Sequence, residues 1–171
     1  DNPDLPVFLY GHSLGGLLTM TYVVRRRPAV NGMVASAPAL DSELREQKVK
    51  FTAANILGGI VPGVTIPTGL DAEGVSRDPE VVAAYLADPL VHDKGSLALA
   101  KQTFSAMDAM MATTRFPIPL LIIHGTADRL TVPSASRVFA DNTEGDITLV
   151  EYPGMYHEPH NEPEKAEVLD E

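Results

Sequence analysis

The sequence predicts an α/β fold with a parallel sheet of about four strands and helices between them. Four apolar runs have the length and composition of buried strands: Val7–Tyr10, Val30–Ser36, Leu120–Ile123 and Ile147–Tyr152. Segments with helical capping signals or an apolar stripe separate these runs, which is the pattern of strands joined by crossover helices. Because parallel strands end at the same edge of a sheet, we expect the functional groups in the loops that follow the strands.

The composition is that of a single globular domain. The 171 residues are 44% hydrophobic, contain no cysteine and include no apolar run long enough for a membrane helix. The lack of cysteine excludes disulfides, thiolate metal ligands and a cysteine nucleophile. The one basic cluster, Arg25–Arg27, ends a predicted helix, where cations suit the helix dipole. We therefore expect no nucleic-acid partner, no metal ion and no cofactor.

The negative charge is concentrated at the C-terminal end of the chain. The formal net charge is −10, and residues 141–171 carry 10 acidic side chains against the single base Lys165. Residues 1–140 are nearly balanced, with 13 acids and 12 bases. We interpret the acidic end as a solvated surface rather than a cation site.

The pentapeptide Gly11–Gly15, of sequence GHSLG, is a candidate nucleophile elbow. Residues 7–20 have the strand, turn, helix order that gives the G-x-S-x-G pattern this meaning. The turn pushes the Ser13 side chain out at the end of the strand, and we expect both glycines to avoid a clash that a Cβ would cause. Ser13 then lies at a helix N-terminus, where the backbone N–H of Leu14 is the expected oxyanion donor.

The ends of the other elements can also be predicted. The helix after the elbow should run to about Arg27, because Pro28 follows it. A helix from Pro79 to about Ala87 follows the capping segment Ser76–Asp78. The other predicted helices are an amphipathic one over residues 96–114 and a short one over residues 134–140.

Residues 41–95 differ from the rest of the chain and are predicted to form an inserted cap. A polar helix capped by Asp41 or Ser42 leads into residues 55–67, where glycine and proline exclude a long element while apolar residues persist. Such a segment suits a lid over a binding site, and a partly buried loop is the alternative. The predicted substrate-binding side chains are those of Ile56, Leu57, Ile60, Val61 and Ile66.

Three reactive side chains fall at the carboxyl ends of three different strands. Ser13 follows the first strand, and Asp128 and His157 follow the third and fourth, in acid and base loops that lie within residues 124–160. This order along the chain is that of an α/β-hydrolase. We expect Ser13 to attack an acyl carbon, His157 to accept and return the proton, and Asp128 to orient the imidazole.

The acid and the base both have rivals. Asp128 alone could be a turn acid, and Asp141 and Asp146 are near in sequence, but one falls at a helix end and the other precedes the last strand. His160 competes with His157 as the base, yet its proline-flanked position suits the start of a helix. The other histidines are expected beneath the elbow (His12), in support of a turn (His124) and on the lid surface (His92).

Five ordered segments carry a resemblance that spans nearly the whole chain. They are residues 11–16 (GHSLGG), 76–78 (SRD), 88–91 (DPLV), 123–129 (IHGTADR) and 154–158 (GMYHE). Together they resemble the monoacylglycerol lipases, in the lysophospholipase-like branch of the α/β-hydrolases. The resemblance implies the triad positions for Ser13, Asp128 and His157, an apolar cap over residues 41–95, and a lipid ester as substrate.

The chain departs from that family at its start. The resemblance implies further strands before Val7–Tyr10 and a His-Gly loop with the second oxyanion N–H. We therefore expect residues 1–171 to be the C-terminal part of an α/β-hydrolase fold. Right-handed crossovers would place its helices on one face and leave the other face and the first strand's edge uncovered. Such a piece alone should be poorly soluble and nearly inactive.

The leading functional hypothesis is a serine carboxylester hydrolase that cleaves monoacylglycerols or similar lipid esters through an acyl-enzyme. Another esterase or a lysophospholipase is the close alternative, because fold and triad do not select the leaving group. A catalytically silent partial domain is a hypothesis of a different class. The lipid-ester hypothesis also favours peripheral membrane contact through the cap and a cytoplasmic or membrane-peripheral location. The oligomeric state stays open.

Overall fold

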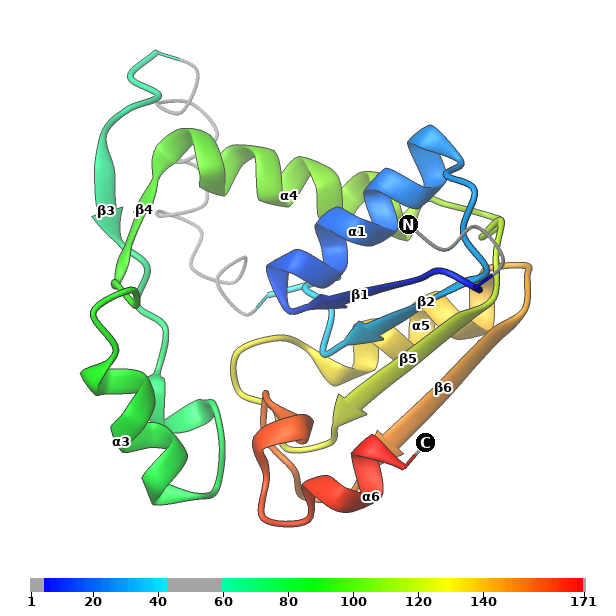
Figure 1. Cartoon of the computed structure of the whole chain (residues 1–171). Coiled ribbons are helices and arrows are strands. Elements are labelled where there is room, and N and C mark those ends of the chain that lie inside the picture. The colour runs from blue at the N-terminus through cyan, green and yellow to red at the C-terminus, as the bar shows by residue number, and fades with distance from the viewer. Residues whose placement is uncertain (1–4, 43–59, 171) are drawn as a thin grey trace.

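The computed structural model describes residues 5–42 and 60–170, which are built around a four-stranded parallel sheet (Figure 1). The strands, in their order across the sheet, are β1 (Phe8–His12), β2 (Gly32–Ser36), β5 (Leu120–Gly125) and β6 (Ile147–Tyr152). Every neighbouring pair is parallel, with Gly11 opposite Ala35 and Ile122 opposite Leu149. The predicted parallel sheet of about four strands is confirmed.

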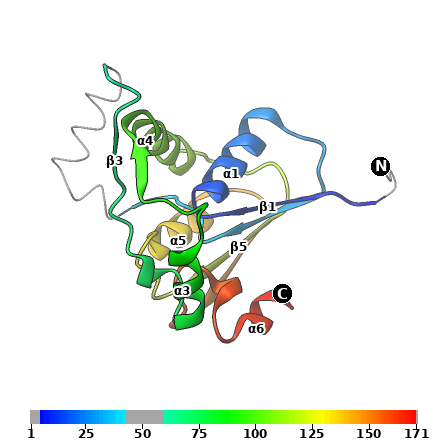
Figure 2. The same ribbon diagram turned by 60° about the vertical axis from the view of Figure 1, so that its left-hand side comes forward.

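Helices cover both faces of the sheet, but unequally. They are α1 (Leu14–Arg26), α4 (Leu97–Met111), α5 (Pro133–Asn142) and the short α6 (Lys165–Leu169). Leu120 and Ile122 point to the face where α1, α4 and α5 form the main core. Ile123 points to the opposite face and packs near Val168 of α6, because successive side chains of a strand alternate. Figure 2 shows α1 and α4 on one side of the sheet and α6 on the other.

Two helices begin where the sequence predicts them to begin, and each has a side-chain cap. Ser96 precedes α4, and its Oγ accepts a hydrogen bond from the Leu99 N–H at 3.0 Å. Asp78 precedes α3 (Pro79–Ala87), and its Oδ1 accepts from the Glu80 N–H at 2.9 Å. Each cap satisfies an N–H group of the first turn that has no acceptor within the helix.

Residues 60–96 lie beside the carboxyl ends of the sheet strands (Figure 1). They contain η2 (Ala72–Gly74), α3, and a small antiparallel sheet of β3 (Thr65–Pro67) and β4 (Lys94–Ser96). The small sheet was not predicted, because three-residue strands that contain proline or glycine show no alternating pattern. The predicted polar helix after Asp41 falls on residues 43–59, which lie outside the described residues.

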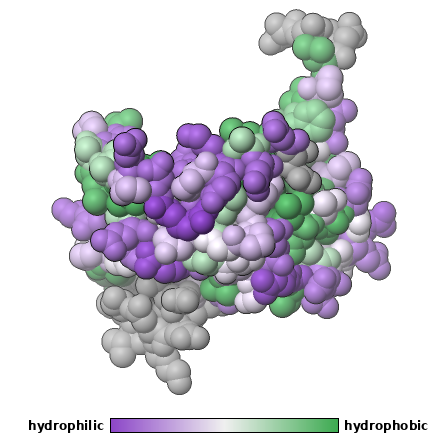
Figure 3. All heavy atoms as spheres, turned by 90° about the horizontal axis from the view of Figure 1, so that it is seen from below, coloured by the Kyte–Doolittle hydropathy of each residue, from purple (hydrophilic) through white to green (hydrophobic). Residues whose placement is uncertain are grey.

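Apolar side chains are exposed along the β1 edge of the sheet. Phe8 and Tyr10 of β1 are 62% and 56% exposed, and Leu18 and Tyr22 of α1 are also exposed. Residues 5–7, which lead into β1, project from the body of the molecule (Figure 2). The underside of the molecule, in the orientation of Figure 1, is mostly hydrophilic over its middle (Figure 3).

None of the described helices is long and apolar enough to cross a membrane.

Candidate active site

The predicted elbow is present between β1 and α1. Ser13 joins the strand to the helix and has φ 54° and ψ −125°. A non-glycine residue with positive φ is strained, and it persists only where its surroundings enforce it. Two backbone bonds do so here: the Ser13 N–H donates to the Ser36 carbonyl at 2.9 Å, and the Ala39 N–H donates to the Ser13 carbonyl at 3.0 Å. The strained turn presents Ser13 at the wall of a cavity.

The two glycines of the pentapeptide are not equivalent, which corrects the expectation that both avoid a clash. A Cβ on Gly11 would lie 2.7 Å from the carbonyl oxygen of Gly15 and 2.9 Å from the Cα of Gly16. A Cβ on Gly15 would meet no described heavy atom within 4 Å. The steric requirement therefore falls on Gly11, and next on Gly16, where a Cβ would lie 3.1 Å from Pro38 Cβ.

Asp128 lies in the turn after β5 and accepts five hydrogen bonds. Its Oδ1 accepts from the N–H groups of Leu130 at 2.7 Å and Thr131 at 3.0 Å. Its Oδ2 accepts from Thr131 Oγ1 at 2.8 Å, His157 Nδ1 at 2.7 Å and His124 Nε2 at 3.1 Å. Burial raises the pKa of this carboxyl, but the bonds from His124 and His157 outweigh it and hold the pKa well below its usual value. Asp128 is therefore a carboxylate at neutral pH.

His157 lies in the loop after β6, and only 5% of its surface is exposed. Backbone bonds fix this loop against the segment before α3. The His157 N–H donates to the Gly74 carbonyl at 3.3 Å, and the Glu158 N–H donates to the Val75 carbonyl at 2.8 Å. Because Nδ1 donates to Asp128, the neutral ring carries its free lone pair on Nε2. Nε2 is the atom that a general base presents to a serine.

Ser13 and His157 line one cavity of about 380 Å³. No hydrogen bond joins these two side chains among the described residues, and catalytic pairs often tighten only when a substrate binds. The rest of the described lining is mostly apolar and comes from the elbow, the small sheet, α3, α4 and the acid and base loops: His12, Leu14, Ala39, Ser42, Ile66, Pro67, Thr68, Leu70, Val75, Tyr85, Gly95, Ser96, Leu99, Ala100, Thr103, Phe104, Met107, Leu130, Thr131 and Glu158.

The rival acids lie away from this cavity. Asp141 is in the last turn of α5, and Asp146 immediately precedes β6, at the amino end of that strand. The cavity lies instead at the carboxyl ends of the strands, where Ser13 and His157 are found. Asp128 is the acid that the structure brings to His157.

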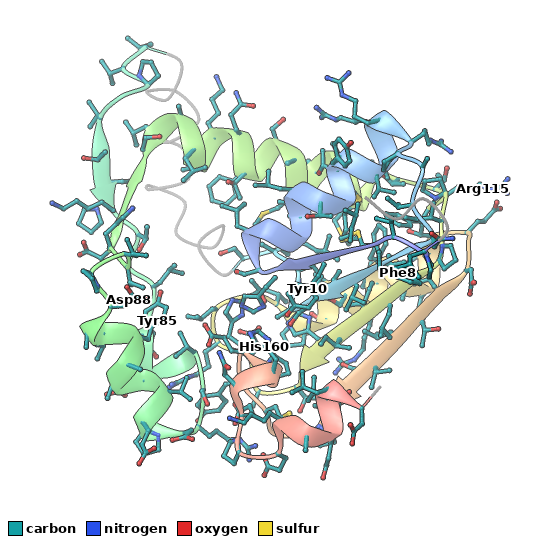
Figure 4. The ribbon with its side chains drawn as sticks, in the orientation of Figure 1. Phe8, Tyr10, Tyr85, Asp88, Arg115 and His160 are labelled. Atoms are coloured by element: carbon teal, nitrogen blue, oxygen red, sulfur yellow. The ribbon has the colours of Figure 1, made fainter. Side chains whose placement is uncertain are left out.

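The rival base His160 lies near His157 but has other partners. It is part of the short helix η3 (Pro159–Asn161), and its Nδ1 is 3.3 Å from the Tyr10 hydroxyl oxygen. Tyr10 and His160 are labelled in Figure 4, at the carboxyl end of β1. His160 is not among the described residues of the cavity wall, whereas His157 both lines the wall and bonds to Asp128. His92, expected on the lid surface, is exposed.

His12 packs between the elbow and the base. Its Nδ1 is 3.2 Å from Ser36 Oγ, and its ring centroid is 4.7 Å from that of His157 and 5.0 Å from that of His160. Burial, with smaller contributions from His157 and His160, lowers the pKa of His12 to about 3. His12 is therefore neutral at the pH at which a histidine base works.

Three buried side chains extend the site beyond the predicted residues. His124, expected to support a turn, bonds to Asp128 through Nε2 and to Ser136 Oγ through Nδ1, at 2.8 Å. Thr131 donates to Asp128, and its position three residues later is a local signal for such a bond. Ser136 carries no such signal, because the fold alone brings α5 next to His124.

The predicted cap residues have different locations. Ile66 of β3 lines the cavity. Ile60 and Val61 are 71% and 40% exposed and are not among the described residues of its wall. Ile56 and Leu57 lie outside the described residues. Within residues 5–42 and 60–170, no group of three or more His, Cys, Asp or Glu side chains could hold a metal ion.

Comparison with known proteins agrees with this geometry. Residues 1–164 match the family model Hydrolase_4, described as serine aminopeptidase, S33. The chain is 40% identical over 174 residues to a monoacylglycerol lipase of Mycolicibacterium smegmatis, covering 100% of this chain and 62% of the lipase. It is 30% identical over 170 residues to the phospholipase YtpA of Bacillus subtilis, covering 97% of this chain and 66% of that protein.

A solved structure shows the same fold. The crystal structure of Paleococcus ferrophilus monoacylglycerol lipase aligns with a TM-score of 0.89 and 38% identity, over 96% of this chain and 65% of that chain. The chain thus spans less than two thirds of each of these three proteins. The family match covers nearly the whole of this chain, so the chain belongs to the serine aminopeptidase S33 (Hydrolase_4) family and has an α/β-hydrolase fold.

Proposed function

We propose that this protein is a serine carboxylester hydrolase that cleaves monoacylglycerols, or similar lipid esters, to a fatty acid and an alcohol. The 2.7 Å bond between His157 and Asp128, at the wall of an apolar cavity that Ser13 also lines, is the observation that supports it most. A serine nucleophile needs a base, and the base needs an acid to orient it. The likeness to two proteins named monoacylglycerol lipase suggests the substrate class.

In the proposed reaction, Ser13 Oγ attacks the ester carbonyl carbon while His157 Nε2 takes the hydroxyl proton. Asp128 keeps Nδ1 protonated and stabilises the imidazolium. His157 then gives its proton to the leaving alcohol oxygen, the ester C–O bond breaks, and the acyl group stays on Ser13. A water molecule, deprotonated by His157, attacks the acyl-enzyme and releases the fatty acid.

The start of α1 is suited to hold the negative oxygen that forms in both steps. Leu14 is the first residue of α1 and lines the cavity beside Ser13. The first N–H groups of a helix have no acceptor within the helix, and the helix dipole favours negative charge there. We assign the Leu14 N–H as one oxyanion donor, a group whose loss commonly costs about 10² to 10³ in kcat.

The cavity wall is suited to an acyl chain. Leu70, Leu99, Phe104 and Leu130 contribute apolar side chains to it. Each methylene that leaves water for such a wall contributes about 0.8 kcal/mol. A chain of several carbons can therefore supply most of the binding energy, and Ser13 at the wall receives the ester group.

The described wall also favours a neutral leaving group. It contains no Lys or Arg among the described residues, and Glu158 is its one carboxylate. A phosphate in the leaving group would find no described cation in this wall to pair with, whereas glycerol carries no charge. The likeness to phospholipase YtpA keeps a lysophospholipid as the second candidate substrate.

Both candidates can be tested in one assay of the full-length protein. Fatty acid release is measured from 1-monooleoylglycerol and from oleoyl lysophosphatidylcholine, with Ser13→Ala as the control. Higher kcat/KM for the monoacylglycerol, abolished in Ser13→Ala, supports the proposal. Higher kcat/KM for the lysophospholipid would make that lipid, and not the monoacylglycerol, the preferred substrate. Hydrolysis that survives in Ser13→Ala would overturn the mechanism. A stable protein that hydrolyses neither ester would instead support the catalytically silent alternative.

We infer further that residues 60–96 touch a lipid surface. Val64, Leu86 and Leu90 are exposed apolar side chains of this segment. Their burial in a lipid interface would place the cavity mouth near its substrate. Sedimentation with phosphatidylcholine vesicles tests this: Leu86→Asp with Leu90→Asp should lower the bound fraction, and unchanged binding would exclude this contact.

A further inference from the structure

A chain of buried hydrogen bonds continues from the acid loop into α5. His157 Nδ1 and His124 Nε2 both donate to Oδ2 of Asp128, at 2.7 Å and 3.1 Å. His124 Nδ1 in turn lies 2.8 Å from Ser136 Oγ. His124 and Ser136 are both completely buried. Neither lines the cavity among the described residues, so neither touches a bound substrate.

The chemistry of the side chains determines which atom donates and which accepts in each of these hydrogen bonds. An ionised carboxylate only accepts, so His124 must carry a proton on Nε2 to bond with Asp128. The neutral ring then has its lone pair on Nδ1, and the Ser136 hydroxyl donates to it. Asp128 therefore requires this tautomer of His124, and the Ser136 hydroxyl stabilises it by donating to the Nδ1 lone pair. In the other tautomer, a lone pair of His124 would face the carboxylate.

The two histidines share a single carboxylate oxygen. Thr131 Oγ1 also donates to Oδ2, so three donors converge on that atom. Each donor withdraws charge from the oxygen and limits how strongly it can bond to the others. Without His124, Oδ2 of Asp128 would keep more of its negative charge and would bond more strongly to His157. The carboxylate would also lose one of the contacts that hold it in its present position.

We propose that His124 and Ser136 are positioning residues that set how Asp128 holds the His157 base. This inference rests on the proposed serine hydrolase function. Asp128, His12 and His160 are the titratable groups whose rings or carboxylate face His157, and Glu158 is its neighbour in the chain. His124 faces Asp128, Thr131 and Ser136. The His124 and Ser136 pair makes no direct hydrogen bond with His157 among the described residues and reaches it through Asp128 and through Thr131, whose Oγ1 lies 3.3 Å from His124 Nε2 and 3.4 Å from His157 Nδ1.

Four single variants of the full-length protein separate this role from simple packing. His124→Leu keeps the volume but removes both polar atoms. His124→Gln restores a donor toward Asp128 and an acceptor toward Ser136. Ser136→Ala removes the hydroxyl that donates to His124 Nδ1 and leaves that buried lone pair without its partner. Ser134→Ala is the matched control, because Ser134 is an exposed serine in the same first turn of α5.

The first readout is the pH profile of kcat/KM for a soluble ester. His124→Leu should lower the plateau on the order of tenfold and move the acidic limb to higher pH by roughly half a unit, because a hydrogen bond to a charged group is lost. Ser136→Ala should move the limb in the same direction with a smaller loss, about threefold. His124→Gln should return the limb toward its wild-type position, and Ser134→Ala should match the wild type.

The second readout does not depend on turnover. The Nδ1 proton of His157, bonded to Asp128, gives a strongly downfield ¹H NMR signal that should shift in His124→Leu and Ser136→Ala but stay in place in Ser134→Ala. If no variant and no wild-type sample hydrolyses esters while this signal still responds, the function is wrong but the positioning is right. The inference would be overturned if neither the acidic limb of the kcat/KM profile nor the His157 Nδ1 proton signal moved in any variant. It would also be overturned if His124→Gln lost as much kcat/KM as His124→Leu.

Discussion

Arg77 and Glu162 form an ion pair across 85 positions of the chain, with Arg77 Nε donating to Glu162 Oε2 at 2.8 Å. The Glu162 side chain is completely buried, whereas the Arg77 side chain is 33% exposed. Glu162 Oε1 also accepts from the Tyr156 N–H at 2.7 Å, one residue before His157. The pair therefore fastens the segment before α3 to the loop that carries the proposed base.

We predict that Arg77→Met lowers both stability and kcat. The change leaves the buried Glu162 carboxylate without its cation, and such losses typically destabilise by about 3 kcal/mol when the pair is fully buried and by less when one partner reaches solvent. Arg137→Met is the matched control, because Arg137 of α5 pairs with Glu151 of β6 and its side chain is 47% exposed. Thermal unfolding and ester hydrolysis should change clearly in the first variant and little in the second. Equal effects would mean that the Arg77 pair has no special link to the base loop.

The elbow glycines should differ in their tolerance of alanine. Gly11→Ala forces a Cβ against backbone atoms of Gly15 and Gly16, so we expect loss of activity and a strongly lowered melting temperature. Gly15→Ala should fold and retain activity, because a Cβ there meets no described atom within 4 Å and alanine suits a helix better than glycine. Melting curves and ester turnover of the two variants test this. A Gly15→Ala variant that fails to fold would contradict the geometry of the elbow.

Ile66 and Ile60 should differ in their effect on acyl-chain preference. Ile66 lines the cavity and Ile60 does not, although the two were predicted together from the sequence. Ile66→Asp should raise KM for a long-chain ester roughly tenfold, close to the cost of losing one buried aliphatic contact, and should affect an acetate ester much less. Ile60→Asp should leave both KM values near the wild type. The same KM ratio of long to short ester in Ile66→Asp as in wild type would remove Ile66 from the acyl site.

Stability should fall as the pH is lowered, partly through His12. The pKa of His12 is lowered from 6.5 to about 3 in the folded state. As the pH falls below 6.5, His12 is therefore protonated in the unfolded chain but stays neutral in the folded protein. Stability is then lost through the window between 6.5 and 3, and between pH 6.5 and 4.5 this amounts to about 2 kcal/mol. Asp128, whose pKa is also lowered, adds a loss below its ordinary value of 3.8.

Urea unfolding at several pH values tests the His12 contribution. His12→Gln cannot take up a proton, so its free energy of unfolding should decline less between pH 6.5 and 4.5 than that of the wild type. Parallel declines in the two proteins would show that His12 titrates normally in the folded state.

The main features of the site could be predicted because their signals are local. The strand, turn, helix order marks Ser13, and the strand ends before Asp128 and His157 place these two groups at the same edge of the sheet. Their adjacency follows from parallel topology, which the alternation of strands and helices already indicates. The capping segment Ser76–Asp78 and the amphipathic pattern that starts at Ser96 predict two helix starts, again from local signals.

The features of the site that the sequence did not predict depend on contacts between segments far apart in the chain. The bond between His124 and Ser136 needs α5 to pack beside β5, and the pair of Arg77 and Glu162 needs the cap segment beside the base loop. The different requirements at Gly11 and Gly15 appear only when neighbouring backbone atoms are placed around them. Ile60 and Ile66 look alike in the sequence, and only the pairing of β3 with β4 sends one of them to the cavity.

Ser13 is the proposed nucleophile, and His157 is the base that activates it. Intact-protein mass spectrometry with peptide mapping, on full-length protein treated with a fluorophosphonate, tests both roles at once. We predict one adduct per chain, located on Ser13, absent in Ser13→Ala and formed much more slowly in His157→Ala. A folded wild-type protein that gains no adduct, or gains one on another residue while Ser13→Ala still hydrolyses esters, would show that Ser13 is not the nucleophile.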